Sequence, residues 1–220
     1  MSLVPVSLSA DLDAGAVTGI RVAGQDLVLW RDEAGVAHAW DDRCPHRGMR
    51  MSFGFVRGGS LNCLYHGWQY GKDGQCSRIP AHPDLEVPKT IRIPSFPVIE
   101  RAGIVWVSTA PDASLALADP GPVTPLRSLR LPVSLAVALN ALKALPTPDA
   151  GGTVWTAVDD ATGFLTVGPH RLLVACHESG PNAVALHVVL LGEADAATRV
   201  ALSRWLAAVR LSLASAEEAA

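Results

Sequence analysis

Residues 44–68 read CPHRGMRMSFGFVRGGSLNCLYHGW and contain two short pairs of cysteine and histidine. The first pair is Cys44-Pro45-His46, and the second is Cys63-Leu64-Tyr65-His66. Sixteen residues separate His46 from Cys63. Each pair supplies one thiolate and one imidazole. Together they form the ligand set of a 2Fe–2S cluster in which two histidines replace two cysteines on one iron.

The glycines near these pairs indicate two tight loops. Gly48 and Gly67 let the backbone turn sharply and bring amide groups toward the sulfur atoms. A structural zinc ion bound by two cysteines and two histidines is the alternative. The single residue between Cys44 and His46 departs from the roughly two to four residues that usually separate paired zinc ligands. The spacing therefore favours the iron–sulfur cluster.

The segments around the two pairs extend the pattern. They are residues 36–43, 70–76, 79–81 and 96–107. Together with the two pairs, they resemble the amino-terminal Rieske domain of Rieske non-heme iron (aromatic ring-hydroxylating) oxygenase alpha subunits. The resemblance covers about residues 1–112 and implies an antiparallel β-sandwich that holds a Rieske 2Fe–2S cluster.

The same resemblance implies a role for each ligand. Cys44 and Cys63 are expected to bind the buried iron, and His46 and His66 the outer iron near the surface. Respiratory-complex Rieske proteins carry two further cysteines as a disulfide, at positions that here are Met49 and Tyr65. The lack of that pair favours the lower part of the roughly −150 to +300 mV range of Rieske centres. Such a potential suits a carrier that is fed from NAD(P)H through a reductase.

Composition and charge exclude several classes of partner. The 220 residues include 18 basic and 21 acidic side chains, so the chain has no basic excess for binding nucleic acid. The longest apolar stretch, residues 131–142, is interrupted and shorter than the roughly 20 residues that span a bilayer. The amino terminus has neither a basic segment nor a compact apolar segment, which predicts a cytoplasmic protein without a secretory signal. Four cysteines are too few for a disulfide scaffold.

Proline divides the chain into predicted parts. The densest prolines run from Pro111 to Pro132, which predicts a Rieske domain at 1–112, a Pro-rich linker at 113–132 and a carboxy-terminal domain at 133–220. In the first part, β-branched and aromatic runs between turn signals predict a small antiparallel β domain. The predicted strands cover residues 19–22, 26–30, 36–40, 61–65, 68–70 and 104–107.

The carboxy-terminal part is predicted to combine strands with a final helix. Strands are predicted at 153–158, 163–167, 171–177 and 183–191, and a five-residue turn at 178–182 joins the last two. Leu202, Leu206, Val209 and Leu213 recur at helical spacing, which predicts an amphipathic helix from Asp195 to about Ala214. Residues 133–145 fit either a helix or a strand. With the resemblance, these elements predict a reduced α+β helix-grip-like domain, so the whole chain is expected to be mainly β plus α.

A complete oxygenase of the family carries a second iron site, and its ligands are not recognisable here. Such enzymes hold a mononuclear Fe(II) on two histidines and one carboxylate. At the equivalent segment Asn140 matches, but Lys143 and Pro146 stand in the places of the aspartate and the first histidine. The stretch after residue 112 is also shorter than a full catalytic domain of the family. The sequence therefore predicts no catalytic residues and argues against a mononuclear iron.

Histidines near the carboxy terminus provide a substitute site only if three ligands meet. The candidates are His170, His177, Glu178 and His187. In a hairpin with the predicted five-residue turn, His177 faces Ala183 and His187 faces Leu173. His170 and His177 point to opposite faces of one strand, since side chains alternate along it. No three of these ligands are expected to converge.

These features predict a Rieske-type iron–sulfur protein that carries single electrons, an oxidoreductase component in electron transport. The expected donor is a reductase or ferredoxin, and the expected acceptor is a catalytic oxygenase homologue in a homo- or hetero-trimer. Arg47 either faces an anionic redox partner or donates structural hydrogen bonds to nearby carbonyls. One alternative is an active Rieske mono- or dioxygenase with an unconventional non-heme iron site, and another is a redox sensor that binds a small ligand. Substrate, physiological donor and acceptor, and oligomeric state stay open.

Overall fold

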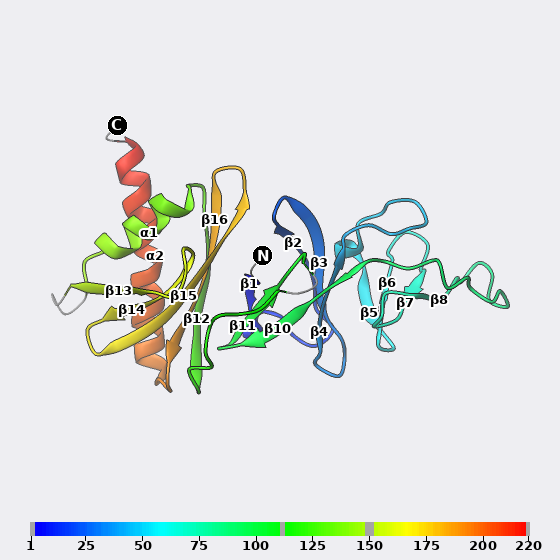
Figure 1. Cartoon of the computed structure of the whole chain (residues 1–220), viewed down its shortest axis with the longest axis horizontal. Helices are drawn as coiled ribbons and strands as arrows, with labels where there is room; N and C mark the ends of the chain where they lie inside the picture. The colour runs from blue at the N-terminus through cyan, green and yellow to red at the C-terminus, as the bar shows by residue number, and fades with distance from the viewer. Residues whose placement is uncertain (1–2, 111–112, 148–151, 219–220) are drawn as a thin grey trace. The chain divides into compact units, whose positions relative to one another are not determined.

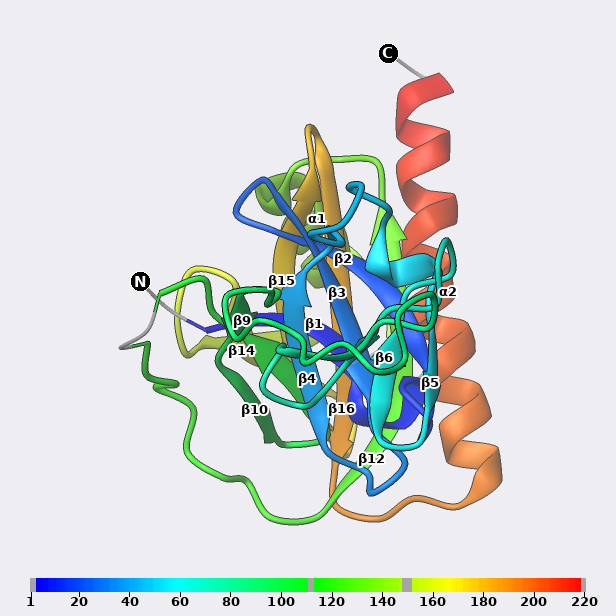
Figure 2. The same cartoon turned by 90° about the vertical axis from the view of Figure 1, so that its right-hand side faces the viewer.

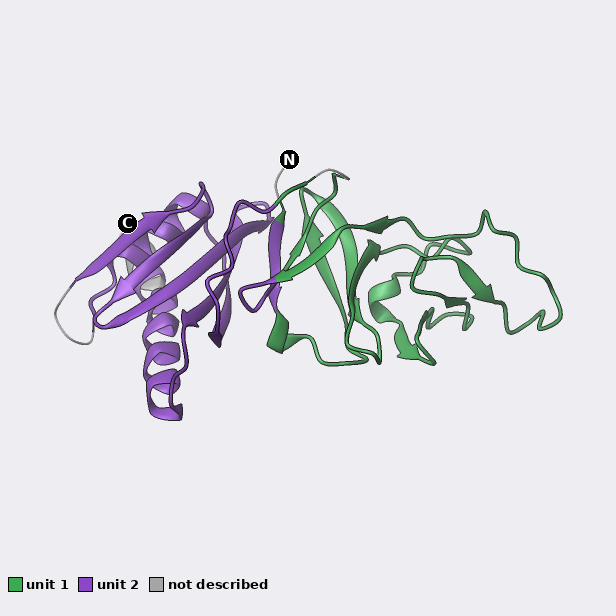
Figure 3. Cartoon of the chain, turned by 60° about the horizontal axis from the view of Figure 1, so that its bottom comes forward, with its two compact units in different colours: residues 1–3, 9–100, 105–114 green, residues 4–8, 101–104, 115–220 purple. Residues whose placement is uncertain are grey.

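The computed structural model describes residues 3–110, 113–147 and 152–218. The chain divides into two compact units, which Figure 3 colours separately. Unit 1 comprises residues 1–3, 9–100 and 105–114, and unit 2 comprises residues 4–8, 101–104 and 115–220. In the described part of the chain, no helix has both the length and the apolar character needed to cross a membrane.

Unit 1 contains two four-stranded antiparallel sheets (Figure 1). The first has the order β2 (Val17–Val22), β3 (Gln25–Arg31), β4 (Ala37–Asp41) and β9 (Ser95–Phe96). The second has the order β5 (Phe55–Arg57), β6 (Ser60–Asn62), β7 (Gln69–Tyr70) and β8 (Cys76–Arg78). Unit 1 also has two short 3-10 helices, η1 (Ser9–Asp11) and η2 (Met51–Phe53). The neighbouring strands β10 (Val98–Arg101) and β11 (Ile104–Val107) belong to unit 1 except at their facing ends, residues 101 and 104, which belong to unit 2. The predicted antiparallel β domain is thereby confirmed.

A buried apolar cluster fixes the positions of two cysteines in unit 1. Its fully buried members include Trp30, Trp40, Met51, Leu61, Tyr70 and Ile93. Cys44 and Cys63 belong to the same cluster. Protein interiors pack as densely as organic crystals, so side chains in such a cluster have little freedom to shift. The loops that carry these cysteines are therefore anchored at both sulfur atoms by the core.

Unit 2 is a five-stranded antiparallel sheet with two helices (Figures 1 and 2). The sheet order is β12 (Val123–Leu131), β16 (Ala183–Leu191), β15 (His170–Gly180), β14 (Thr162–Val167) and β13 (Thr153–Ala157). The helices are α1 (Leu135–Ala144) and α2 (Ala196–Glu218), and β1 (Val4–Leu8) contacts β12, β15 and β16. One face of the sheet packs against both helices through a large apolar cluster that includes Leu186, Leu206 and Val209. This arrangement confirms the predicted α+β part with a final amphipathic helix.

One segment of unit 2 differs from the prediction, and another decides between two alternatives that the sequence left open. Val123–Leu131, placed in the predicted linker, forms β12 and pairs with β16. Pro125 obscures this strand in the sequence, and the structure accommodates the proline on an edge strand with a register shift between Pro125 and Arg127. Residues 135–144, which fitted either a helix or a strand, form α1, and the Ser134 hydroxyl accepts a hydrogen bond from the Val137 amide at its start.

The hairpin between β15 and β16 has a tighter turn than predicted. β15 continues to Gly180, so only Pro181 and Asn182 connect the strands, and Asn182 has a positive φ of 50°. A register shift between Glu178 and Gly180 takes up the remaining residue. His177 consequently pairs with Ala185 and not with Ala183.

Replacing Leu206 by alanine is expected to destabilise the protein. Leu206 is fully buried where α2 meets the sheet, so truncation leaves a cavity and costs about 2–5 kcal/mol of unfolding free energy. Urea denaturation followed by circular dichroism measures this loss. Leu211→Ala on the same helix is the control, since Leu211 is 71% exposed and its truncation is expected to cost less than about 0.5 kcal/mol. Equal losses for the two variants would contradict the packing of α2.

Candidate metal centre

Two loops of unit 1 close with the same pair of backbone hydrogen bonds. The first loop follows β4 and contains Cys44 and His46, and the second connects β6 to β7 and contains Cys63 and His66. In each loop the cysteine amide donates to the carbonyl five residues on, and the amide four residues on donates to the cysteine carbonyl. The distances are 2.8 Å for Cys44 N to Met49 O, 2.9 Å for Gly48 N to Cys44 O, 2.9 Å for Cys63 N to Trp68 O and 2.9 Å for Gly67 N to Cys63 O. The two loops thus share one hydrogen-bonded frame.

Glycine makes this closure possible. Gly48 has a φ of 71° and Gly67 a φ of 69°, in the left-handed region that glycine adopts without steric cost. A Cβ atom at Gly67 would also lie 3.3 Å from Cγ of Pro80. Because the chain must turn here, the strand predicted at 61–65 is wrong beyond Asn62.

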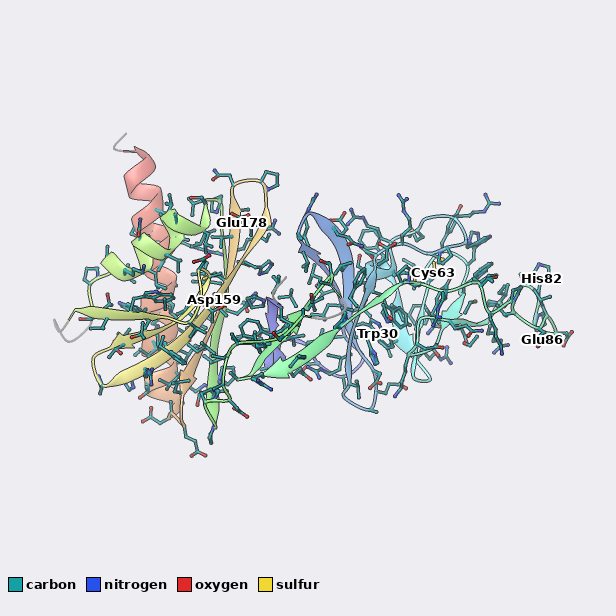
Figure 4. The ribbon with its side chains drawn as sticks, viewed as in Figure 1. Trp30, Cys63, His82, Glu86, Asp159 and Glu178 are labelled. Atoms are coloured by element: carbon teal, nitrogen blue, oxygen red, sulfur yellow. The ribbon has the colours of Figure 1, made fainter. Side chains whose placement is uncertain are left out.

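The loops place their cysteines inside the core and their histidines at the surface. Cys44 and Cys63 are each 2% exposed, whereas His46 and His66 are exposed. Figure 4 labels Cys63 within the side chains of unit 1. Burial raises the pKa of the Cys63 thiol, and the neighbouring Cys44 thiol raises it further. The His46 and His66 ring centroids lie 4.7 Å apart. The four residues predicted as ligands therefore come together as a buried sulfur pair and an exposed nitrogen pair.

This donor set fits a 2Fe–2S cluster with different ligands on its two irons. Two thiolates on one side and two imidazoles on the other match the iron pair of such a cluster. Among the described residues, no three or more histidine, cysteine, aspartate or glutamate side chains gather as they would around a single metal ion.

Hydrogen-bond donors surround the sulfur atoms. The Tyr70 hydroxyl lies 3.1 Å from Cys44 Sγ, and it donates when that sulfur is a thiolate. Burial raises the pKa of Tyr70 far above its ordinary value, and the nearby Cys44 adds to the shift, so the hydroxyl keeps its proton. The backbone amides of Tyr65 and His66 also interact with the Cys63 sulfur. These groups stabilise negative charge on the sulfur atoms.

Aromatic rings fix the two imidazoles. The Trp68 ring stacks on His46 with a centroid separation of 4.3 Å and an interplanar angle of 7°. The ring centroids of Tyr65 and His66 lie 3.9 Å apart. Partial desolvation lowers the pKa of His46, and the nearby His66 and Arg47 lower it further. The neutral imidazole that results is the form that binds metals.

A buried carboxylate ties the end of the second loop to the first sheet. Asp32 is fully buried, and its Oδ2 lies 2.7 Å from Lys72 Nζ and 3.2 Å from His38 Nε2. Its Oδ1 accepts hydrogen bonds of 2.9 Å from the amides of Ala34 and Val36. Burial opposes ionisation, but Lys72, Val36 and His38 outweigh it and hold the pKa of Asp32 well below its ordinary value. Lys72 follows β7, so this ion pair links the strand after Cys63 to the β3–β4 connection.

Sequence reasoning missed the roles of Tyr70, Trp68 and Asp32. The role of Tyr70 could have been predicted from its position on the strand that follows the second loop. A residue there that faces the core is close enough to a cysteine sulfur to donate a hydrogen bond to it. Trp68 directly follows Gly67 in the second loop. Its carbonyl accepts the hydrogen bond from the Cys63 amide, and this bond holds Trp68 at the end of the loop. Asp32 gives no sequence signal, since its partners Lys72 and His38 are defined only by the fold.

The remaining candidate residues are not among the four proposed ligands. Arg47 is exposed beside His46. Cys76 and Cys176 are each 1% exposed and belong to the apolar clusters of units 1 and 2, where they pack as small apolar side chains. His177 and His187 stack with ring centroids 5.7 Å apart, which the predicted register did not bring together.

The segment predicted to correspond to the mononuclear iron ligands has other contacts. Asn140 is exposed on α1. Lys143 Nζ lies 5.2 Å from the ring centroid of Trp155. The Pro146 carbonyl accepts a 2.7 Å hydrogen bond from Trp205 Nε1. Lys143 and Pro146 thus contribute to the packing of unit 2, and Asn140 faces solvent.

Comparisons with known proteins relate this chain to Rieske proteins. Residues 2–97 match the family described as "Rieske [2Fe-2S] domain". The oxidoreductase NdmD of Pseudomonas putida is 40% identical over 105 residues, which are 47% of this chain and 18% of NdmD. The 4beta-methylsterol monooxygenase of Methylococcus capsulatus is 41% identical over 124 residues, or 54% of this chain and 33% of that protein. The chain therefore covers a third or less of the length of these relatives.

Solved structures show the same fold over nearly the whole chain. NdmA of Pseudomonas putida CBB5 superposes with a TM-score of 0.73 at 17% identity, covering 94% of this chain and 78% of NdmA. Dicamba monooxygenase bound to dicamba gives a TM-score of 0.71 at 20% identity, covering 94% of this chain and 82% of that protein. At this identity the likeness concerns the fold.

Replacing Tyr70 by phenylalanine is expected to lower the reduction potential of the centre. The variant loses a donor to a cluster ligand, and a hydrogen bond to a charged acceptor is worth about 1.5–3 kcal/mol. If roughly 1.4 kcal/mol of this favours the reduced form, the potential falls by about 60 mV. A spectroscopic redox titration measures the shift. Tyr65→Phe is the control, since its ring also lies in the second loop; a shift as large in this variant would argue against the Tyr70 hydrogen bond.

Proposed function

Because residues 2–97 form a Rieske [2Fe-2S] domain, we propose that this protein carries single electrons through a cluster held by Cys44, His46, Cys63 and His66. The observation that carries the proposal is the matched closure of two loops, which gathers two buried thiols and two exposed imidazoles. Cys44 and Cys63 bind the inner iron, and His46 and His66 bind the outer iron.

The cluster, when bound, supplies a site that accepts and releases one electron. The chain determines where that electron can enter and how strongly it is held. The core around Cys44 and Cys63 keeps water from the sulfur atoms. Tyr70 and the amides of Tyr65 and His66 donate to those atoms and favour the added negative charge. The exposed His46 and His66 rings give a short path from the centre to the surface.

The surface around the histidines is suited to a transient redox partner. Leu64 and Tyr65 are each 58% exposed beside His66, and Arg47 is an exposed cation beside His46. Apolar side chains next to a cation fit a partner with an acidic rim and an apolar centre. We propose that a reductase or ferredoxin donates the electron here and that an oxygenase homologue accepts it, within a homo- or hetero-trimer. The relatives named above, an oxidoreductase and a monooxygenase, support this setting.

The contacts of unit 2 support a role in electron transfer over oxygen activation. The segment where the family's mononuclear iron ligands are expected makes other contacts. Lys143 lies over the Trp155 ring, the Pro146 carbonyl accepts a hydrogen bond from Trp205, and Asn140 faces solvent. An oxygenase with an unconventional iron site is the competing function, and the metal content of the protein separates the two.

Analysis of iron and acid-labile sulfide tests the proposal. A carrier is expected to contain about two irons and two sulfides per chain, whereas an oxygenase with a further iron contains about three irons and two sulfides. Cys63→Ser is expected to lose the cluster and its visible absorption. Cys76→Ala is the matched control, because Cys76 is equally buried in the same core but is not a proposed ligand. Loss of iron from the Cys76 variant alone would refute the ligand assignment.

Replacing His66 by cysteine is expected to lower the reduction potential. A thiolate adds negative charge to the outer iron and stabilises its oxidised form. The expected change is at least about 100 mV, because all-cysteine 2Fe–2S centres lie near −400 mV and Rieske centres lie at about −150 mV and above. A redox titration of the cluster-loaded variant gives the value, and an unchanged or raised potential would count against His66 as a ligand.

A further inference from the structure

Unit 2 carries a group of buried polar atoms that lack partners. Five buried side-chain nitrogen or oxygen atoms of the described residues have no hydrogen-bond partner. Three of the five belong to one hairpin: His177 Nδ1 and Ser179 Oγ on β15, and His187 Nε2 on β16. These residues are 8%, 8% and 4% exposed. Burying polar atoms without partners is costly, so such a group calls for a molecule that satisfies it.

The strand register brings the two histidines together on one face of the sheet. His177 pairs with Ala185 and His187 pairs with Ala175, so the histidines are diagonal neighbours. Their rings are nearly parallel, at an interplanar angle of 10°. The flanking residues Cys176 and Leu186 point into the apolar cluster under the helices. By strand alternation, the histidines lie on the opposite face.

The neighbouring strand β12 adds a cation to this face. Ser128 pairs with His187, and its Oγ lies 3.0 Å from His187 Nδ1, which fixes that ring and leaves its Nε2 as the unpartnered atom. Arg130 is the next residue on the same face, and its Nη2 donates a 3.4 Å hydrogen bond to the Ser179 carbonyl. Within the described part of the chain, Arg130 makes no ion pair with a carboxylate.

The charge of this group favours an anion over a metal cation. Desolvation lowers the pKa of His177 to about 4 and that of His187 to about 3, with Arg130 adding to the first shift and His177 to the second. Both imidazoles are therefore neutral near pH 7, and Arg130 supplies a positive charge. Glu178, labelled in Figure 4, is exposed, and it is not among the causes of the His177 shift. β1, which contacts all three strands, has the sequence VPVSL and no titratable side chain.

An apolar groove begins at the same arginine. It has a volume of about 560 Å³ and is lined by Arg130, Leu131, Pro132, Val133, Ala183, Arg210 and Leu213. This volume falls within the range of small-molecule sites, which are mostly apolar with a few polar groups that fix orientation. Gly180 lies next to both Arg130 and the groove residue Ala183. A Cβ atom added to Gly180 would lie 3.7 Å from Arg130 Nη2 and 3.8 Å from Ala183 Cβ. Arg130 thus belongs both to the polar group and to the groove lining, and its carbonyl accepts a 3.0 Å hydrogen bond from Arg210 on the helix side of the groove.

We propose that unit 2 binds a small organic carboxylate with an apolar chain. The carboxylate lies against the Arg130 guanidinium and accepts hydrogen bonds from Ser179 and an imidazole N–H, and the apolar chain occupies the groove. Arginine suits this role because its planar guanidinium can pair with both carboxylate oxygens. This site is separate from the proposed electron-transfer function and does not depend on it.

Nuclear magnetic resonance of the histidine rings tests the proposal. The full chain, carrying its oxidised cluster and labelled in histidine, is titrated at pH 7 with hexanoate and, as a neutral match of the same length, with hexanamide. Hexanoate is expected to shift the His177 and His187 ring signals saturably, and hexanamide is not. Arg130→Gln is expected to weaken hexanoate binding at least about tenfold, the effect of losing one hydrogen bond to a charged group.

Arg127→Gln provides the matched control. Arg127 is an exposed arginine on the same strand that donates to the Ser203 carbonyl, and its loss is expected to leave hexanoate binding unchanged. Equal binding of hexanamide, or an equal loss in both arginine variants, would overturn the carboxylate site. Histidine shifts produced by Zn²⁺ and not by hexanoate would overturn the choice of an anion. No shift with either probe would assign the unpartnered atoms to water and refute the proposal.

Discussion

The arrangement of the metal centre depends on the hydrogen-bonded closure of two short loops. In each loop a cysteine amide and its carbonyl are both satisfied within six residues, with Gly48 or Gly67 in the left-handed conformation. This closure turns each cysteine toward the core and leaves the following histidine at the surface. Both loops use the same frame, but His46 stands two residues after its cysteine and His66 stands three residues after its own. Two equal frames thus give a site whose inner and outer halves differ in chemistry.

The surrounding core holds both loops, and an ion pair between half-exposed Lys72 and buried Asp32 ties the end of the second loop to the first sheet. Trp40, Met51 and Leu61 pack in the same cluster as both cysteines. The Asp32–Lys72 pair joins the strand after the second loop to the first sheet. The Asp32 carboxylate is fully buried, and His38 and the amides of Ala34 and Val36 hold it together with Lys72. The position of the second loop is therefore set by polar contacts as well as by packing.

The sequence allowed the ligand motif and the longer strands to be predicted, because both depend on local patterns. The two pairs and their glycines are contiguous, and strands such as Asp26 to Trp30 carry strong β-forming residues. Strands β7 and β9 have only two residues each and are too short to show alternation. β12 was missed because Pro125 suggests a linker, and its place in a sheet depends on a partner about 60 residues away. The Asp32 network was missed for the same reason, since no local pattern marks it.

The β15–β16 hairpin shows how a small error in a turn hides a site. With a five-residue turn, His177 and His187 are four positions apart in the ladder. The observed two-residue turn and the irregularity at Glu178–Gly180 move them to diagonal positions, where their rings stack. The helix-covered face of the same sheet is filled by apolar side chains, among them Leu206 and Val209. Polar side chains of three neighbouring strands, among them Ser128, His177 and His187, consequently meet on the other face.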